Sequence, residues 1–170
     1  MTAPPARKRL ILVNGTMGVG KTTTCLALMD RLQPAAFLDG DWCWTMKPWT
    51  VNDRSIAMVE RNIAFVLRGY LANPDIGTVI FGWVMHRAEI VRRLIASVEP
   101  QDAELHVVSL VCSPEALAAR IRADAARSPG ALAGSLDRLP MYRDMPWPKI
   151  DVSAIGADEA ADRIAAMAGA

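Results

Sequence analysis

The stretch LILVNGTMGVGKT, residues 10–22, decides the fold of this chain. Its first part, residues 10–14, is an apolar run of the kind that forms a central strand covered on both faces. Its second part, residues 15–22, has the pattern G-x-x-x-x-G-K-[ST] directly after that run. Glycines there let the backbone curl around an anion, so that main-chain N–H groups and a helix N-terminus point at it. The stretch therefore predicts a phosphate-binding loop.

The polar side chains of this loop have expected tasks. Lys21 reaches the β and γ phosphates of a nucleotide as a point charge, and the Thr22 hydroxyl can ligate Mg²⁺. The expected cofactors are therefore Mg²⁺ and ATP, or a related nucleotide. The loop residues predicted to hold the nucleotide are Gly15, Thr16, Met17, Gly18, Val19, Gly20, Lys21, Thr22 and Thr23.

Length and composition indicate one globular domain and exclude several kinds of partner. The chain has 170 residues, 52% of them hydrophobic and 22% charged, which suits a single core. A formal net charge of +1 gives no field that would recruit nucleic acid or an anionic membrane, so neither is an expected partner. Three widely spaced cysteines predict reduced thiols and a cytoplasmic location. The expected assembly is a monomer or a homodimer.

Short apolar runs alternate with longer amphipathic segments, which is typical of βαβ units. The sequence predicts an α/β fold, a three-layer α/β/α sandwich with a five-stranded, mostly parallel sheet. We expect strands at residues 10–14, 35–38, 78–84, 105–112 and 149–152. We expect helices at residues 21–32, about 52–71, 87–98 and 158–167, and another that begins at Ser113 and Pro114. Residues 128–134 are predicted to form a loop before a short helical turn at 135–139, which Pro140 ends.

Two carboxylates follow the second predicted strand, at the edge of an open α/β sheet where ligands bind. Gly40 lets the chain turn between them, so Asp39 and Asp41 can face different partners. Asp39 would hold Mg²⁺ through water, and Asp41 would accept the proton of a substrate hydroxyl as a general base. The alternative interpretation is a solvated turn without a catalytic role.

Aromatic residues and a histidine near the same edge are candidate substrate contacts. Trp42 follows the Asp pair, and Trp83 and His86 lie near the end of the third predicted strand. An indole can stack on a planar or sugar-like molecule, and an imidazole can bind an acceptor or tune Asp41. The alternative is that the two indoles pack in the core or the lid and that His86 is a helix-cap or packing residue.

The residues together carry a resemblance to a known family. GTMGVGKTT after LILVN, the DGD at residues 39–41, the arginines at 120, 122 and 127 and the KIDVS at residues 149–153 resemble the small-molecule P-loop kinases. Shikimate kinase and gluconate kinase are nearest in layout, and antibiotic phosphotransferases and tunicamycin-resistance-type proteins are similar. The resemblance implies an adenylate-kinase-like P-loop fold in one domain, residues 1–170. It also implies a lid at about residues 121–135, a substrate lobe at about 41–72 and transfer of the ATP γ-phosphate.

The resemblance also implies roles for single residues. Asp41 matches the substrate-orienting acid, and Arg61 matches a substrate-binding arginine. Arg120 would stack on adenine, and Arg127 would act as a catalytic lid arginine, although solvated helix charge is the alternative for both. The chain departs from shikimate kinase after the third strand, where GWVMH at residues 82–86 replaces a glycine-rich turn. This departure argues against shikimate as the substrate.

Several hypotheses of function stay open at the level of sequence. The leading hypothesis is an ATP- and Mg²⁺-dependent kinase of a small hydroxyl-bearing molecule, and antibiotic modification is a separate possibility. A nucleoside or nucleotide kinase would use the same tryptophans to stack a base. A nucleotide-dependent binding protein without catalysis would use ATP only to order its lid.

Overall fold

The structure, a computed structural model, describes residues 7–124 and 130–169 and contains a parallel sheet of five strands. The strand order is β2-β3-β1-β4-β5, and every strand pair is parallel. The strands are β1 (Arg9–Asn14), β2 (Ala35–Asp39), β3 (Thr78–Trp83), β4 (Glu104–Val111) and β5 (Lys149–Asp151). The predicted five-stranded parallel sheet is thus confirmed, with the strand that carries the phosphate loop at its centre.

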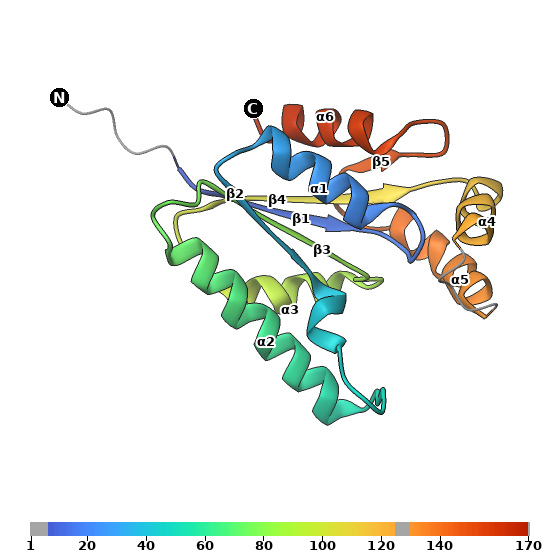
Figure 1. The fold of residues 1–170 in the computed structure, drawn as a ribbon, viewed down its shortest axis with the longest axis horizontal. Helices are drawn as coiled ribbons and strands as arrows, with labels where there is room; N and C mark the ends of the chain where they lie inside the picture. The colour runs from blue at the N-terminus through green and yellow to red at the C-terminus, as the bar shows by residue number, and fades with distance from the viewer. Residues whose placement is uncertain (1–6, 125–129, 170) are drawn as a thin grey trace.

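Helices cover both faces of this sheet. They are α1 (Lys21–Arg31), α2 (Asp53–Ala72), α3 (Ala88–Val98), α4 (Pro114–Ala123), α5 (Ala131–Arg143) and α6 (Ala157–Met167), and a short 3-10 helix, η1 (Gly40–Trp44), follows β2. In Figure 1, α1 and α6 lie on one face and α2 and α3 on the other, while α4 and α5 lie beyond the tip of β4. The predicted three-layer sandwich is confirmed.

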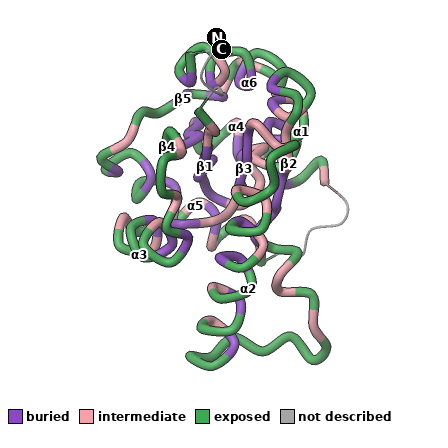
Figure 2. Tube along the Cα trace, turned by 90° about the vertical axis from the view of Figure 1, so that its left-hand side faces the viewer, coloured by how far each residue is buried: buried purple, intermediate pink, exposed green. Residues whose placement is uncertain are grey.

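The alternation of side chains along β1 explains why both faces must be covered. Ile11 and Val13 belong to a core shared with α1 and α6, whereas Leu10 and Leu12 belong to a second core shared with α2 and α3. Successive side chains of a strand point to opposite faces, so a fully apolar strand requires two apolar layers. Figure 2 shows β1 and β3 as the buried centre of the molecule.

Two helix starts form as the sequence predicts. The Asn52 side chain accepts hydrogen bonds from the N–H groups of Arg54 and Ser55, and the Ser55 hydroxyl accepts one in return from the N–H of Asn52. The Ser113 hydroxyl accepts from Ala116 N–H at the start of α4. Such caps satisfy N–H groups that have no partner within the helix.

The prediction for residues 130–140 is wrong. Instead of a loop and a short turn that Pro140 ends, the chain forms the continuous helix α5 with Pro140 inside it. The helix buries Leu139 in the core beside α1, and Tyr142 against Val111 and Met145. Burying two large side chains outweighs the cost of about 3 kcal/mol that an interior proline imposes.

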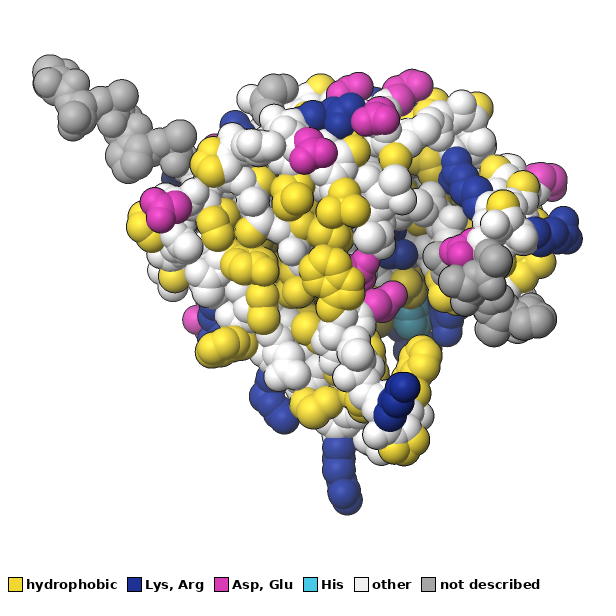
Figure 3. Space-filling model, viewed as in Figure 1, with side chains coloured by type: hydrophobic (Ala, Val, Ile, Leu, Met, Phe, Trp, Pro, Cys, Tyr) yellow, Lys and Arg dark blue, Asp and Glu magenta, His cyan; other side chains and the backbone are white. Residues whose placement is uncertain are grey.

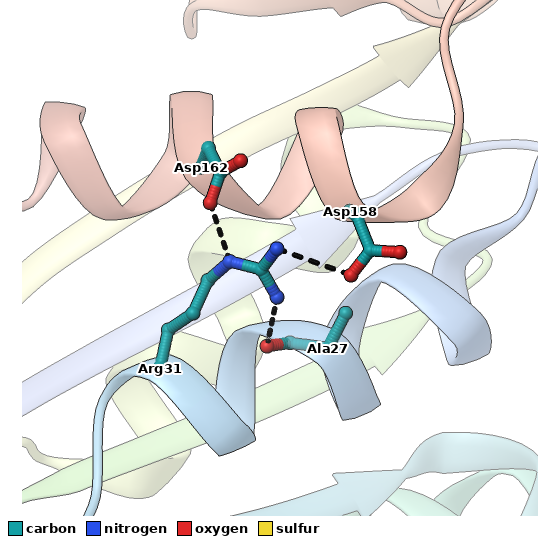
Figure 4. Close-up of polar contacts among 4 residues, drawn as sticks. All are labelled: Ala27, Arg31, Asp158 and Asp162. Atoms are coloured by element: carbon teal, nitrogen blue, oxygen red, sulfur yellow. Dashed lines mark hydrogen bonds and ion pairs between the residues drawn. The ribbon is translucent and has the colours of Figure 1, made fainter.

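A polar clamp joins the helices that cover one face. Arg31 of α1 donates from Nε to Asp162 Oδ1 (2.5 Å) and from Nη2 to Asp158 Oδ1 (3.1 Å), both on α6. Its Nη1 donates to the carbonyl of Ala27 (2.8 Å), as Figure 4 shows. The side chains of the clamp are accessible to solvent, so water and salt weaken their attraction. The clamp therefore fixes how the two helices lie more than it adds to stability.

The described part of the chain holds no helix that is both long enough and apolar enough to cross a membrane.

The proline inside α5 gives a test of this helix. Pro140→Ala is expected to raise the free energy of unfolding by about 1 kcal/mol, because the gain in helix propensity exceeds the extra freedom of the unfolded chain. Urea denaturation followed by circular dichroism measures it. Pro74→Ala, in the exposed turn after α2, is the control and is expected to cause a slight loss or no change. A loss for Pro140→Ala would contradict a helix that continues through residue 140.

Candidate active site

The loop between β1 and α1 has the backbone of a phosphate cradle. Gly15, Gly18 and Gly20 have φ values of 156°, 85° and 107°, a region that favours glycine. A Cβ atom on Gly18 would lie 2.6 Å from Cγ1 of Ile121, so α4 packs directly on the loop. A Cβ on Gly20 would meet nothing within 4 Å, which leaves this side of the loop open to a ligand.

A cavity of about 390 Å³ opens over this loop. Figure 3 shows acidic and basic side chains and a histidine gathered in a hollow between the side of the molecule formed by α1 and α2 and the side formed by α4 and α5. The cavity is lined by residues 17–24 of the loop and α1, by Asp39, Asp41 and Val84, by Arg120 and Asp124, and by Val152 and residues 155–157. The structure therefore brings both predicted carboxylates, Arg120 and most of the predicted loop residues together, whereas Gly15 and Thr16 do not line the cavity.

Asp39 connects the phosphate loop to the turn that carries Asp41. Its Oδ2 accepts a hydrogen bond from the Thr22 hydroxyl (2.6 Å), and its Oδ1 accepts one from the main-chain N–H of Asp41 (3.0 Å). Asp39 is only 8% exposed. One buried carboxylate thus fixes both the hydroxyl at the start of α1 and the position of the second carboxylate.

The oxygen atoms at this point suit a hard divalent cation. Thr22 offers a hydroxyl, and Asp39 and Asp41 offer carboxylates, which are the ligand types that Mg²⁺ takes together with water and nucleotide phosphates. Among the described residues, no group of three or more His, Cys, Asp or Glu side chains forms a metal site of its own. A magnesium ion bound through one or two protein groups and the phosphates fits the residues present.

Lys21 and Arg120 lie on two walls of the cavity. Lys21 Nζ donates to the carbonyl of Thr16 (3.0 Å), which holds the ammonium group over the loop. Arg120 donates to the carbonyl of Val19 (3.1 Å) and to that of Val152. Arg120 therefore joins the loop to the segment after β5, and its stacking on adenine stays a prediction.

Asn14 has a structural role that was not inferred from the sequence. It is fully buried at the end of β1, where its Oδ1 accepts from the N–H groups of Gly15 and Met85 and its Nδ2 donates to the Met85 carbonyl, each at 2.9 Å. A single carboxamide thus links the first residue of the phosphate loop to the segment after β3. The available signal was one polar residue that ends an otherwise apolar strand.

The two predicted pocket tryptophans make packing contacts, and neither lines the cavity. Trp83 lies against Gly40, where a Cβ would stand 2.4 Å from the indole Cγ. Trp42 is 56% exposed and contacts Phe37 edge-on, with 5.5 Å between ring centroids. Arg61 is exposed on α2 and does not line the cavity either. The substrate contacts predicted for these three residues stay predictions.

His86 does not line the cavity, and the positive charge of a basic side chain of α5 acts on it. Its Nδ1 atom is buried without a hydrogen-bond partner among the described residues. Burial, and then the positive charges of Arg138 and Arg87, lowers the pKa of His86 below its ordinary value. Arg138 was not predicted as a site residue, because the helix that carries it was predicted to be a loop and a short turn.

The predicted lid lies partly outside the described residues. Arg127 and its neighbours at 125–129 belong to the part that is not described. Residues 121–123 end α4, and residues 131–135 begin α5. The lid and the catalytic role of Arg127 therefore stay predictions.

Solved structures share this fold along nearly the whole chain. The tunicamycin resistance protein of Deinococcus radiodurans is 19% identical with a TM-score of 0.69, covering 95% of this chain and 96% of that one. Shikimate kinase from Acinetobacter baumannii is 20% identical with a TM-score of 0.64, covering 96% and 94%. The APS kinase of Mycobacterium tuberculosis is 15% identical with a TM-score of 0.66, covering 98% and 100%. The predicted resemblance in fold to small-molecule P-loop kinases is confirmed.

In sequence alone, no curated protein matches the chain. A family model described as an AAA domain, AAA_18, matches residues 11–133, which run from β1 and the phosphate loop into α5. The match covers well over half of the chain, and the chain therefore belongs to the AAA_18 family.

Proposed function

We propose that this protein is a P-loop kinase that transfers the γ-phosphate of ATP, with Mg²⁺, to a hydroxyl group of a small molecule. The observation that carries the proposal is the 2.6 Å hydrogen bond between Thr22 and Asp39, which stands beside Asp41 in the cavity above the phosphate loop. A phosphate cradle alone would support only nucleotide binding. A carboxylate next to the metal position, on a turn fixed by the same Asp39, adds a group that can act on an acceptor.

The nucleotide lies along the cavity in this proposal. Its phosphates sit on residues 17–22, where main-chain N–H groups and the N-terminus of α1 face them. Its base lies between Arg120 and the segment at residues 155–157. Mg²⁺, when bound, neutralises charge on the β and γ phosphates. A solved APS kinase with a likeness in fold holds AMPPNP, which supports ATP as the donor.

The transfer step uses groups that this chain positions. The acceptor hydroxyl oxygen forms a bond to the γ phosphorus while Asp41 accepts the hydroxyl proton. The bond between the γ phosphorus and the bridging oxygen breaks, and ADP leaves with that electron pair. Lys21 offsets negative charge on the phosphate oxygens during the transfer.

The acceptor lies near Asp41 and Val84, which line the same cavity as the phosphate loop. His86 and Arg138 do not line the cavity, so a role for them toward the acceptor would need a molecule that extends beyond it. A tunicamycin resistance protein and a shikimate kinase have this fold, which supports a small acceptor rather than a protein or a nucleic acid. A cytoplasmic location agrees with three cysteines that are free thiols.

Asp41→Asn tests the assignment of the general base. The variant is expected to bind Mg-ATP about as tightly as the wild type, while transfer falls by about 100-fold or more, because an amide cannot accept the proton. Calorimetry gives the affinity. Consumption of ATP with a panel of sugars, hydroxy acids, aminoglycosides and nucleosides gives the transfer rate and also separates a nucleoside kinase from the other acceptor classes.

Asp75→Asn, in the exposed turn before β3, is the matched control and should keep wild-type transfer. If no acceptor raises ATP consumption and Asp41→Asn binds ATP like the wild type, the protein is a nucleotide-dependent binding protein and not a kinase.

Thr22→Val tests the metal position. The change keeps the side-chain shape but removes the hydroxyl that would ligate Mg²⁺ and that donates to Asp39. We expect the Mg²⁺ concentration for half-maximal ATP consumption to rise by about tenfold or more, which corresponds to about 1.4 kcal/mol. Thr22→Ser keeps the hydroxyl and should retain the wild-type dependence on Mg²⁺. Equal dependence in the Val and Ser variants would place the metal elsewhere.

A further inference from the structure

The two residues that flank Gly15 do not line the cavity, and the side chain of each binds the main chain of another element. On one side of Gly15, Asn14 binds the main chain of Met85 through two hydrogen bonds of 2.9 Å. On the other side, the Thr16 hydroxyl donates to the carbonyl of Ser135 on α5 (2.9 Å). The phosphate loop is therefore fixed at its first residues to two elements that are far from it in sequence.

The hydrogen bond from Thr16 to Ser135 lies in the protein interior. Thr16 and Ser135 are both fully buried, and Thr16 does not line the cavity. The Ser135 hydroxyl donates to the Ala131 carbonyl (2.7 Å), so it does not compete for Thr16. A buried hydroxyl that turns away from the ligand and reaches another element has a positional task rather than a binding one.

The two elements fixed in this way carry His86 and Arg138. His86 follows Met85 directly, and Arg138 lies about one helical turn after Ser135 on α5. Besides burial, the positive charge of Arg138 lowers the pKa of His86, with Arg87 contributing in the same direction. Asn14 thus holds the segment that leads to His86, and Thr16 holds the helix that carries Arg138, both at the phosphate loop.

We propose that Thr16 is a positioning residue: its hydroxyl anchors α5 to the phosphate loop and so sets where Arg138 lies relative to His86 and to the transferred phosphate. The role at the phosphate rests on the kinase proposed above. The anchoring itself is a property of the folded chain, and it can be measured without nucleotide or acceptor.

The pH titration of His86 reports the anchoring directly. The chain has only two histidines, so nuclear magnetic resonance resolves the signals of His86 from those of His106 on β4. Thr16→Val keeps the shape of the side chain but removes the donor to Ser135. We expect the titration midpoint of His86 to move upward, because α5 and the positive charge of Arg138 are no longer held in place.

Three further variants complete the test. Arg138→Gln removes the charge and shows how far the midpoint moves when Arg138 no longer acts on His86. Thr16→Ser keeps the hydroxyl and should restore the wild-type midpoint. Thr50→Val, whose hydroxyl donates to the Pro48 carbonyl in an exposed segment, is the matched control and should leave His86 unchanged. If Thr16→Val does not fold, Thr16→Ala removes the same donor with less bulk and takes its place.

The proposal is overturned if Thr16→Val, or Thr16→Ala in its place, keeps the wild-type midpoint of His86 while Arg138→Gln raises it. It is also overturned if Arg138→Gln leaves the midpoint unchanged, or if Thr16→Ser moves it as far as Thr16→Val. A protein that binds no ATP but shows the expected titrations would refute the kinase and leave the anchoring in place.

Discussion

The structure depends on a main-chain loop that only glycine allows, set between a buried strand and a helix. Gly15, Gly18 and Gly20 hold φ values of 156°, 85° and 107°, and a side chain on Gly15 would meet Val19 and the Leu110 carbonyl at less than 3 Å. Because β1 is the central strand, the loop lies where β2, β3 and β4 also end. Every candidate group of the site is placed relative to this loop.

The hydrogen bonds of Asp39 connect the phosphate loop to the carboxylate proposed to take part in phosphate transfer. Asp39 ties the end of β2 to Thr22 at the start of α1 and orients the turn that carries Asp41. Asn14 and Thr16 do the same for the segment after β3 and for α5. The side chains around the loop therefore form a connected polar frame, whereas the two apolar cores on either face of the sheet supply the rigidity beneath it.

Most of the fold and the nucleotide side of the site could be predicted from the sequence. The apolar strands, the capped starts of α2 and α4 and the phosphate loop follow from local patterns, and each is present in the structure. Helix α5 was missed because Pro140 and nearby glycines predict a break, while the burial of Leu139 and Tyr142 that overrides them is a tertiary effect. Contacts such as Thr16 to Ser135 join residues 119 positions apart, and no local pattern encodes them.

The proposed function requires that the loop bind polyphosphate, and calorimetric titration of the folded protein with Mg-ATP measures this binding. We expect the wild type to bind and Lys21→Met to bind about 10- to 100-fold more weakly, because it loses one charged hydrogen bond to phosphate. Lys47→Met, at an exposed position outside the cavity, should bind like the wild type. Absence of Mg-ATP binding by the wild type, or equal affinity of the wild type and Lys21→Met, would show that this loop is not the nucleotide site.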